Sequence, residues 1–166
     1  NSVQPPAGGL QPEYITTFEL EHSHNLTPEV RLTFGGYHNL VDGLIGMVDH
    51  SPVGVDCATT QCFAYENSGA RLTATGAEAQ LRWQPGRFTL VDASYSFVVL
   101  GGDGKDSASG YPAHLASLRG MVPLREGFVR LSGAVTYQSS RRDPQTGARL
   151  GESLLADAGL SGEYGA

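Results

Sequence analysis

The chain has 166 residues, a formal net charge of −6 and a pI near 5.2. Nucleic acid is not an expected partner, because its binding depends on a basic patch and no basic cluster in the sequence exceeds Arg141-Arg142. Charged residues make up 17% of the chain and glycine accounts for 22 residues, whereas soluble domains average about 25% charged residues and about 7% glycine. This composition is unusual for a soluble domain, and residues that favour helices are scarce.

The first half of the chain contains two segments in which apolar and polar side chains alternate, which is the period of a β-strand. Within residues 13–26, Phe18 and Leu20 point one way and Glu19 points the other. A turn separates this segment from a second one at residues 30–48. No apolar run reaches the roughly 18 residues that a transmembrane helix requires.

The rest of the chain contains five further segments with the same period. The clearest is the one in which Val91, Tyr95 and Phe97 oppose Asp92 and Ser94. With the first two segments they make about seven strands. The five lie at about residues 67–84, 88–100, 112–124, 128–139 and 153–165.

The connections between these segments alternate in length. Tight turns are expected at residues 26–29, 85–87 and 125–127, and long loops at residues 49–66, 101–111 and 139–152. Bacterial outer-membrane barrels have short periplasmic turns and long extracellular loops. The predicted fold is therefore all-β: about seven strands of a larger, antiparallel, up-and-down transmembrane β-barrel, with residues 1–12 as an extracellular loop.

The two faces of the predicted sheet differ in chemistry. The charged face is expected to line the lumen, because placing it in lipid would cost about 2–4 kcal/mol for each arginine near the midplane. Its predicted lumen-facing residues are Glu19, Glu78, Arg82, Asp92, Arg119 and Arg130. The residues predicted to face outward are Leu81, Trp83, Val91, Tyr95, Phe97, Leu131, Val135 and Tyr137.

Aromatic residues flank the predicted short turns. Trp83 and Phe88 lie on either side of one turn, and Phe128 opens the strand after another. This placement is typical of the aromatic girdle at a membrane interface. The alternative for Trp83 is a core position in a soluble sheet.

The two cysteines, Cys57 and Cys62, lie in a segment without periodicity. A short-loop disulfide in an oxidising compartment is the favoured interpretation. A metal site that also uses His50 is the alternative, but a closed zinc site requires four ligands and the sequence shows no second pair.

No catalytic, cofactor-binding or metal-binding residues are predicted, and the chain is not expected to be an enzyme. The five histidines lack a metal-binding spacing, and Ser132-Gly133 is not part of a Gly-x-Ser-x-Gly elbow. Asp103 and Asp106 hint at calcium, but the other oxygen ligands of a calcium loop are missing.

Four passages resemble the barrels of TonB-dependent outer-membrane receptors. They follow in the same order as in that family, and the resemblance as a whole covers about residues 9–164. Gly43 interrupts the family's D-L-I sequence, and Gln11 replaces a common lysine. The passages are Gly9–Glu13 leading into Thr17–Leu20 ("L-x-P-E"), Tyr37–Ile45 ("F-Y-x-x-x-x-D-L-I"), Glu66–Ala70 with Thr75–Glu78 ("N-x-G-x-A, then G-x-E-x-E") and Tyr111–Leu115 ("P-x-H").

The resemblance implies a protein of the bacterial outer membrane that imports a scarce nutrient, namely a metal chelate, a vitamin or a glycan. A complete barrel of this family has about 22 strands around a plug, so the chain, which begins at Asn1 without an initiator methionine, is expected to be a piece of a larger protein. Its expected partners are outer-membrane lipid, the remaining strands and the plug, and an inner-membrane energy-coupling protein. A structural or adhesive outer-membrane barrel and a soluble carbohydrate-binding β-sandwich are the alternatives.

Overall fold

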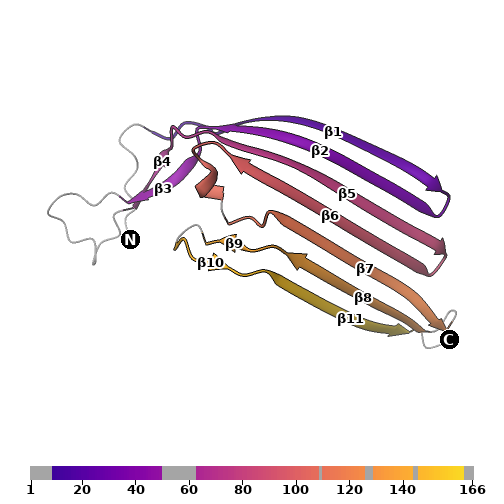
Figure 1. Ribbon diagram of the computed structural model, residues 1–166. Coiled ribbons are helices and arrows are strands. Elements are labelled where there is room, and N and C mark those ends of the chain that lie inside the picture. Colours follow the sequence, from indigo (N-terminus) through magenta and orange to yellow (C-terminus); the bar gives the residue numbers. More distant parts are fainter. Residues whose placement is uncertain (1–8, 50–62, 109, 126–128, 144–145, 163–166) are drawn as a thin grey trace.

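The computed structural model describes residues 9–49, 63–108, 110–125, 129–143 and 146–162. Seven long strands in these residues form one antiparallel sheet in the order β1-β2-β5-β6-β7-β8-β11, so each pairs with the next long strand along the chain (Figure 1). This arrangement confirms the predicted up-and-down, all-β fold. The strands are β1 (Tyr14–Thr27), β2 (Val30–Asp42), β5 (Leu72–Gly86), β6 (Thr89–Gly101), β7 (His114–Arg125), β8 (Val129–Gln138) and β11 (Ser153–Gly162).

One end of the sheet carries the long connections and the other carries the tight turns; we call them the loop end and the turn end (Figure 1). The loop end contains two small hairpins and one short 3₁₀ helix. These elements are β3 (Ile45–Asp49) paired with β4 (Phe63–Asn67), β9 (Arg141–Arg142) paired with β10 (Arg149–Leu150), and η1 (Lys105–Ala108). None of the helices in the described residues is long and apolar enough to cross a membrane.

The strand expected over residues 30–48 is divided in two. β2 ends at Asp42, and Ile45 begins β3 in a separate two-stranded sheet. Gly43 lies between them with a φ of 73°, a conformation that glycine adopts readily and other residues rarely adopt. The chain leaves the main sheet at this glycine, and alternation of side chains alone does not reveal the break.

Pairing along the sheet is continuous except close to the turn end. The register shifts at three places, each beside a tight turn: between Asn25 and Thr27, between Trp83 and Gly86, and between Pro123 and Arg125. Bulges are common at the rims of barrels, and Pro123 cannot donate a hydrogen bond to the ladder. Between these shifts and the loop end, side chains therefore alternate strictly between the two faces.

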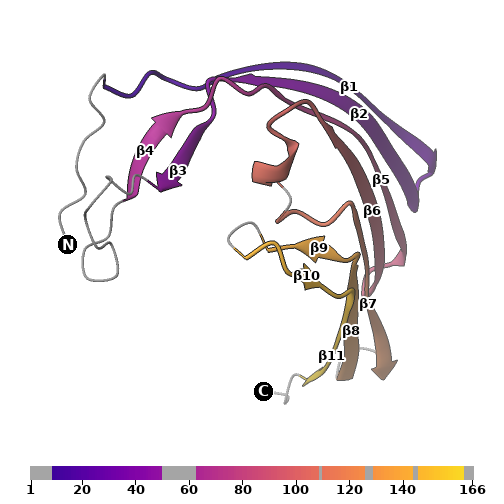
Figure 2. The ribbon, with the colours of Figure 1, turned by 60° about the vertical axis from the view of Figure 1, so that its left-hand side comes forward.

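The sheet is a single curved layer, with η1 and the β9–β10 hairpin on its concave side (Figure 2). Its small apolar cluster lies at the loop end, where Ala108 of η1 packs with Val41 and Leu72. Val41 and Leu72 therefore belong to the concave face. Because pairing is continuous, this assignment extends to every second residue along their strands.

Candidate functional site

The two faces of the sheet differ sharply in charge. We consider the described parts of the seven long strands in which pairing is continuous. There, every Asp, Glu, Lys and Arg except Asp42 lies on the concave face. The convex face is mainly apolar, with histidine and threonine side chains among the apolar ones, and Leu20 there is 79% exposed. The eight residues predicted to face outward all lie on this convex face: Leu81, Trp83, Val91, Tyr95, Phe97, Leu131, Val135 and Tyr137.

The six charged residues predicted to share the opposite face all lie on the concave side: Glu19, Glu78, Arg82, Asp92, Arg119 and Arg130. The structure brings three of them together, since Arg82, Asp92 and Arg119 are in register on β5, β6 and β7. The other three lie elsewhere on the same face.

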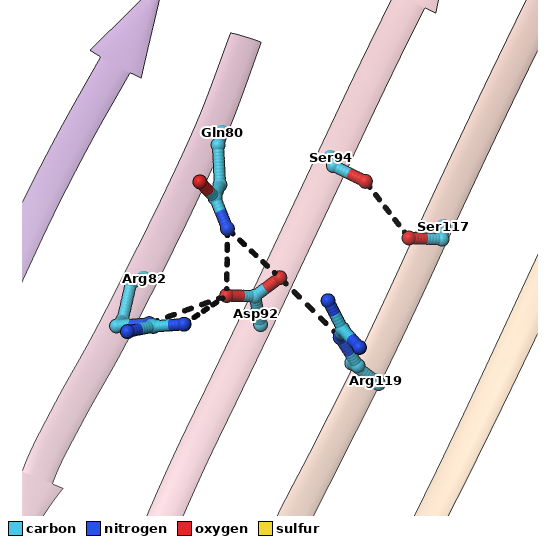
Figure 3. A network of polar contacts seen from close by, with 6 residues as sticks. All are labelled: Gln80, Arg82, Asp92, Ser94, Ser117 and Arg119. Atoms are coloured by element: carbon cyan, nitrogen blue, oxygen red, sulfur yellow. Dashed lines mark hydrogen bonds and ion pairs between the residues drawn. The ribbon is translucent and has the colours of Figure 1, made fainter.

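Asp92 is the centre of a polar network (Figure 3). It is only 1% exposed, and Gln80 donates to its two carboxylate oxygens at 3.3 and 3.0 Å. Arg82 Nη2 lies 3.3 Å from Oδ2, and Arg119 Nε lies 3.5 Å from Oδ1. A buried carboxylate requires such partners, because it has lost its water. The network ties β5, β6 and β7 together, while both guanidinium groups remain half-exposed on the concave face.

An acidic hollow of about 350 Å³ lies nearer the loop end of the concave face. Glu21 on β1 and Glu78 on β5 are both in register with Gly35 on β2. Because Gly35 has no side chain, the two carboxylates border a shared gap. Glu19 and Tyr37 complete the acidic side of the hollow. This arrangement suits a cationic group.

Three further polar residues of the concave face were not singled out as site residues from the sequence: Glu21, Arg31 and Gln80. The signal for them was present in the alternation, since Glu21 lies two positions from Glu19 and Gln80 lies between Glu78 and Arg82. Their partners across the sheet depend on register, which the sequence does not show.

A polar clasp holds the chain at the loop end. The side chain of Asn67 accepts a hydrogen bond from Gln11 N at 2.7 Å and donates to Gln11 O and Gly43 O, each at 2.8 Å. Glu13 accepts a hydrogen bond from Ile45 N at 2.6 Å. These bonds join the segment before β1 to the open end of the β3–β4 hairpin, where Ile45 begins β3 and Asn67 ends β4.

An ion pair lies next to this clasp. Arg71 Nε is 2.7 Å from Asp42 Oδ1. The hydrogen bond and the negative charge of Asp42 raise the pKa of the Arg71 guanidinium, which therefore stays charged at any physiological pH. Three of the sequence passages that carry the family resemblance, 9–13, 37–45 and 66–70, converge on the clasp.

The connection after β6 folds back onto the concave face. Gly104 N donates to Arg71 O at 3.0 Å, and Gly102 has a φ of 82° that favours glycine. These contacts hold η1 over the cluster of Val41 and Leu72.

The aromatic residues predicted at the interface have different environments. Trp83 is on the convex face and is 44% exposed. The Phe88 ring lies instead against two guanidinium groups, with Arg87 Cζ at 5.3 Å and Arg130 Cζ at 4.9 Å from the ring centroid. Phe128 lies outside the described residues.

The predicted disulfide of Cys57 and Cys62 and the alternative metal ligand His50 also lie outside the described residues. Within the described ranges, no group of three or more His, Cys, Asp or Glu side chains is arranged to hold a metal ion.

The chain resembles several solved receptors in fold. The FpvAI–pyocin S2 complex matches with a TM-score of 0.67 and 14% identity, over 92% of this chain and 22% of the receptor chain. The ferripyoverdine receptor of the outer membrane of Pseudomonas aeruginosa, bound to ferripyoverdine, matches with a TM-score of 0.65 and 15% identity, over 92% of this chain and 21% of its own. A mutant of the ferric enterobactin receptor PfeA from Pseudomonas aeruginosa matches with a TM-score of 0.64 and 15% identity, over 92% of this chain and 24% of its own.

The chain thus spans between a fifth and a quarter of the length of these receptors. A search of curated proteins finds no match. The model of one family, described as TonB dependent receptor-like, beta-barrel, matches residues 1–164. The match covers nearly the whole chain, and the seven-stranded antiparallel sheet agrees with it: the chain belongs to the TonB-dependent receptor β-barrel family.

Proposed function

We propose that the chain forms part of the wall of an outer-membrane receptor that imports a scarce nutrient. In this arrangement the convex face meets lipid, the concave face lines the lumen, and the loop end faces the cell exterior. The separation of charge between the two faces carries the proposal. Charges on a lipid face are costly, whereas charges on a lumen wall stay hydrated or paired.

The concave face supports a role in holding a domain inside the lumen. The acidic hollow of Glu19, Glu21 and Glu78 suits basic side chains of such a domain. The half-exposed Arg82 and Arg119 are suited to acidic ones. A plug in this position, coupled to an inner-membrane energy source, would then make transport active rather than diffusive.

A metal chelate is the first substrate class to test, ahead of a vitamin or a glycan. The solved receptors of similar fold include one bound to ferripyoverdine and one named for ferric enterobactin. At the loop end, Asp103 just before η1 and Lys105 and Asp106 within η1 are exposed and are available to contact a ligand.

The orientation of the sheet is tested by two arginine substitutions on neighbouring strands, made in the full-length receptor. Leu118 lies on the convex face of β7, and Thr136 lies on the concave face of β8. We expect Leu118→Arg to destabilise the folded barrel by about 2–4 kcal/mol, and Thr136→Arg to have a much smaller effect. Urea unfolding in lipid vesicles measures the difference. Equal effects, or a larger effect for Thr136→Arg, would reject the proposed orientation.

Transport is tested separately, by growth of a receptor-deletion strain on single iron chelates as the iron source. Growth restored by the full-length receptor and lost without energy coupling supports import. An assembled barrel that restores growth on no chelate, vitamin or glycan would favour the structural or adhesive alternative. A chain that unfolds cooperatively as a water-soluble monomer without detergent would favour the soluble sandwich.

A further inference from the structure

We infer that a small pocket between Arg31 and Arg82 on the concave face binds an oxyanion, namely a carboxylate or phosphate group. The inference rests on the proposed function, because it places this pocket on the wall of the lumen. The pocket has a volume of about 120 Å³ and is lined by Arg31, Thr33, Gln80 and Arg82. It lies closer to the turn end than the acidic hollow does.

Strand register forces the two arginines together. Arg31 on β2 is the direct cross-strand partner of Arg82 on β5, and Thr33 is the partner of Gln80. Directly opposed side chains on one face have Cβ atoms about 4.5–5.5 Å apart. Like charges at that spacing destabilise a sheet, so an added negative charge would stabilise this pair.

The neighbouring carboxylate does not supply enough of it. Asp92 is shared between Arg82 and Arg119. Within the described part of the chain, Arg31 has a hydrogen bond from its Nε to Asn25 Oδ1 at 3.0 Å and no ion pair. Three arginines around one aspartate leave a net charge of about +2 where this row crosses β2, β5, β6 and β7.

The next carboxylate in the row is too far away to help. Asp157 on β11 lies in the row of Arg119 through Ala134. It is two strands from Arg119 and five from Arg31 in the sheet order, and neighbouring strands are about 4.8 Å apart. In this row of the described strands no further carboxylate is within reach, so an additional counter-charge for Arg31 and Arg82 would come from another group.

The lining of the pocket favours an oxyanion over a simple halide. Guanidinium groups present planar pairs of N–H donors that match the oxygens of a carboxylate or phosphate. Thr33 adds a hydroxyl, which shares a 2.7 Å hydrogen bond with Ser23. The Gln80 amide already donates to both oxygens of Asp92. That carboxylate is on β6, on the opposite side of Arg82 from Arg31.

Two sources can supply such a group: an acidic side chain of the domain inside the lumen, or free phosphate. The experiment compares the full-length receptor with its Arg31→Gln variant in detergent. Arg142→Gln is the matched control, because Arg142 is exposed in the β9–β10 hairpin. Thermal unfolding is measured with and without inorganic phosphate, at an ionic strength held constant with sodium chloride.

The sign of the effect decides the question. If an oxyanion is bound, Arg31→Gln removes a ligand and should lower the unfolding midpoint by about 2 °C or more relative to Arg142→Gln. If the pocket is empty, the same substitution relieves repulsion between like charges and loses only the exposed hydrogen bond to Asn25, so the midpoint should rise or fall by less than about 2 °C. That second result, in a wild type whose midpoint is indifferent to phosphate, would overturn the inference.

Phosphate separates the two sources. A lower midpoint for Arg31→Gln that is independent of phosphate indicates a carboxylate of the protein itself. A wild-type midpoint that rises with phosphate, with apparent affinity about tenfold weaker in Arg31→Gln, indicates the free anion.

Arg31→Lys covers the case in which Arg31→Gln does not assemble. It keeps the positive charge but loses the planar fork of donors. A bound oxyanion predicts a lower midpoint for this variant than for wild type, and an empty pocket predicts no difference. Failure of the wild-type receptor itself to assemble in the outer membrane would count against the proposed function. A stable receptor whose unfolding midpoint does not change when Arg31 is substituted counts only against this inference.

Discussion

The ring of Tyr37 on β2 lies directly over Gly76 on β5. The two residues are cross-strand partners on the concave face, and a Cβ atom added at Gly76 would be 2.5 Å from both Cζ and Oη of Tyr37. Glycine leaves the backbone of a strand uncovered, and an aromatic ring on the neighbouring strand compensates for this by packing over it. The pair holds the middle of the β2–β5 interface at a point where a side chain at position 76 would separate the strands.

Gly76→Ala should therefore destabilise the barrel by about 1–3 kcal/mol, as is usual when a methyl group is forced into an occupied space. The Phe97 carbonyl oxygen, 2.6 Å from the added Cβ, cannot move as a flexible side chain would. Urea unfolding in vesicles measures the loss. Gly46→Ala is the control, because nothing lies within 4 Å of a Cβ atom there. Equal stability of the two variants would contradict the packing of Tyr37 on Gly76.

Asp92→Asn should destabilise the barrel by about 1–2 kcal/mol, because it removes the shared charge between Arg82 and Arg119. The figure is modest, since both guanidinium groups are half-exposed and therefore screened by water. The loss should shrink at high salt, which weakens the repulsion between the remaining arginines. Unfolding at low and high ionic strength checks this. Asp103→Asn, at an exposed loop position, should show neither effect.

Asn67→Ala should open the clasp at the loop end without unfolding the sheet. Gln11 N, Gln11 O and Gly43 O each lose their partner. We expect hydrogen exchange at the Gln11 amide to become about tenfold faster, which corresponds to one lost hydrogen bond. Exchange in the middle of β5 should not change. Hydrogen exchange read by mass spectrometry distinguishes these regions, with Gln84→Ala, at an exposed position near the turn end, as the control. Uniformly faster exchange in all strands would mean that Asn67 supports the whole sheet.

The disulfide of Cys57 and Cys62 remains a prediction from the sequence. Protein recovered from the outer membrane should gain two mass units on reduction, because the loop end is expected to face an oxidising compartment. Alkylation with and without a reductant, followed by mass spectrometry, measures this. Two thiols that react without reductant would contradict the prediction.

Local pattern was sufficient for much of the fold. Alternation placed Asp92 and Arg82 on one face and Val91 and Trp83 on the other, because successive side chains of a strand point to opposite faces whatever the strand pairs with. The alternation of short and long connections likewise predicted which strands pair, since a tight turn can only join antiparallel neighbours. A break such as the one at Gly43 was not predicted, because a single positive φ leaves no mark on the pattern.

The sequence by itself thus determined which residues form strands and which side chains share the polar face. The two-residue period of a strand is enough for this, because it does not depend on which strand lies next to it. Only the tertiary structure decided which residues meet across strands: Tyr37 with Gly76, Asp92 between two arginines, Arg31 opposite Arg82, and Asn67 with Gln11. The physical reason is register, since contacts between residues far apart in the chain depend on how far one strand is shifted along the next, and a single strand carries no record of that shift.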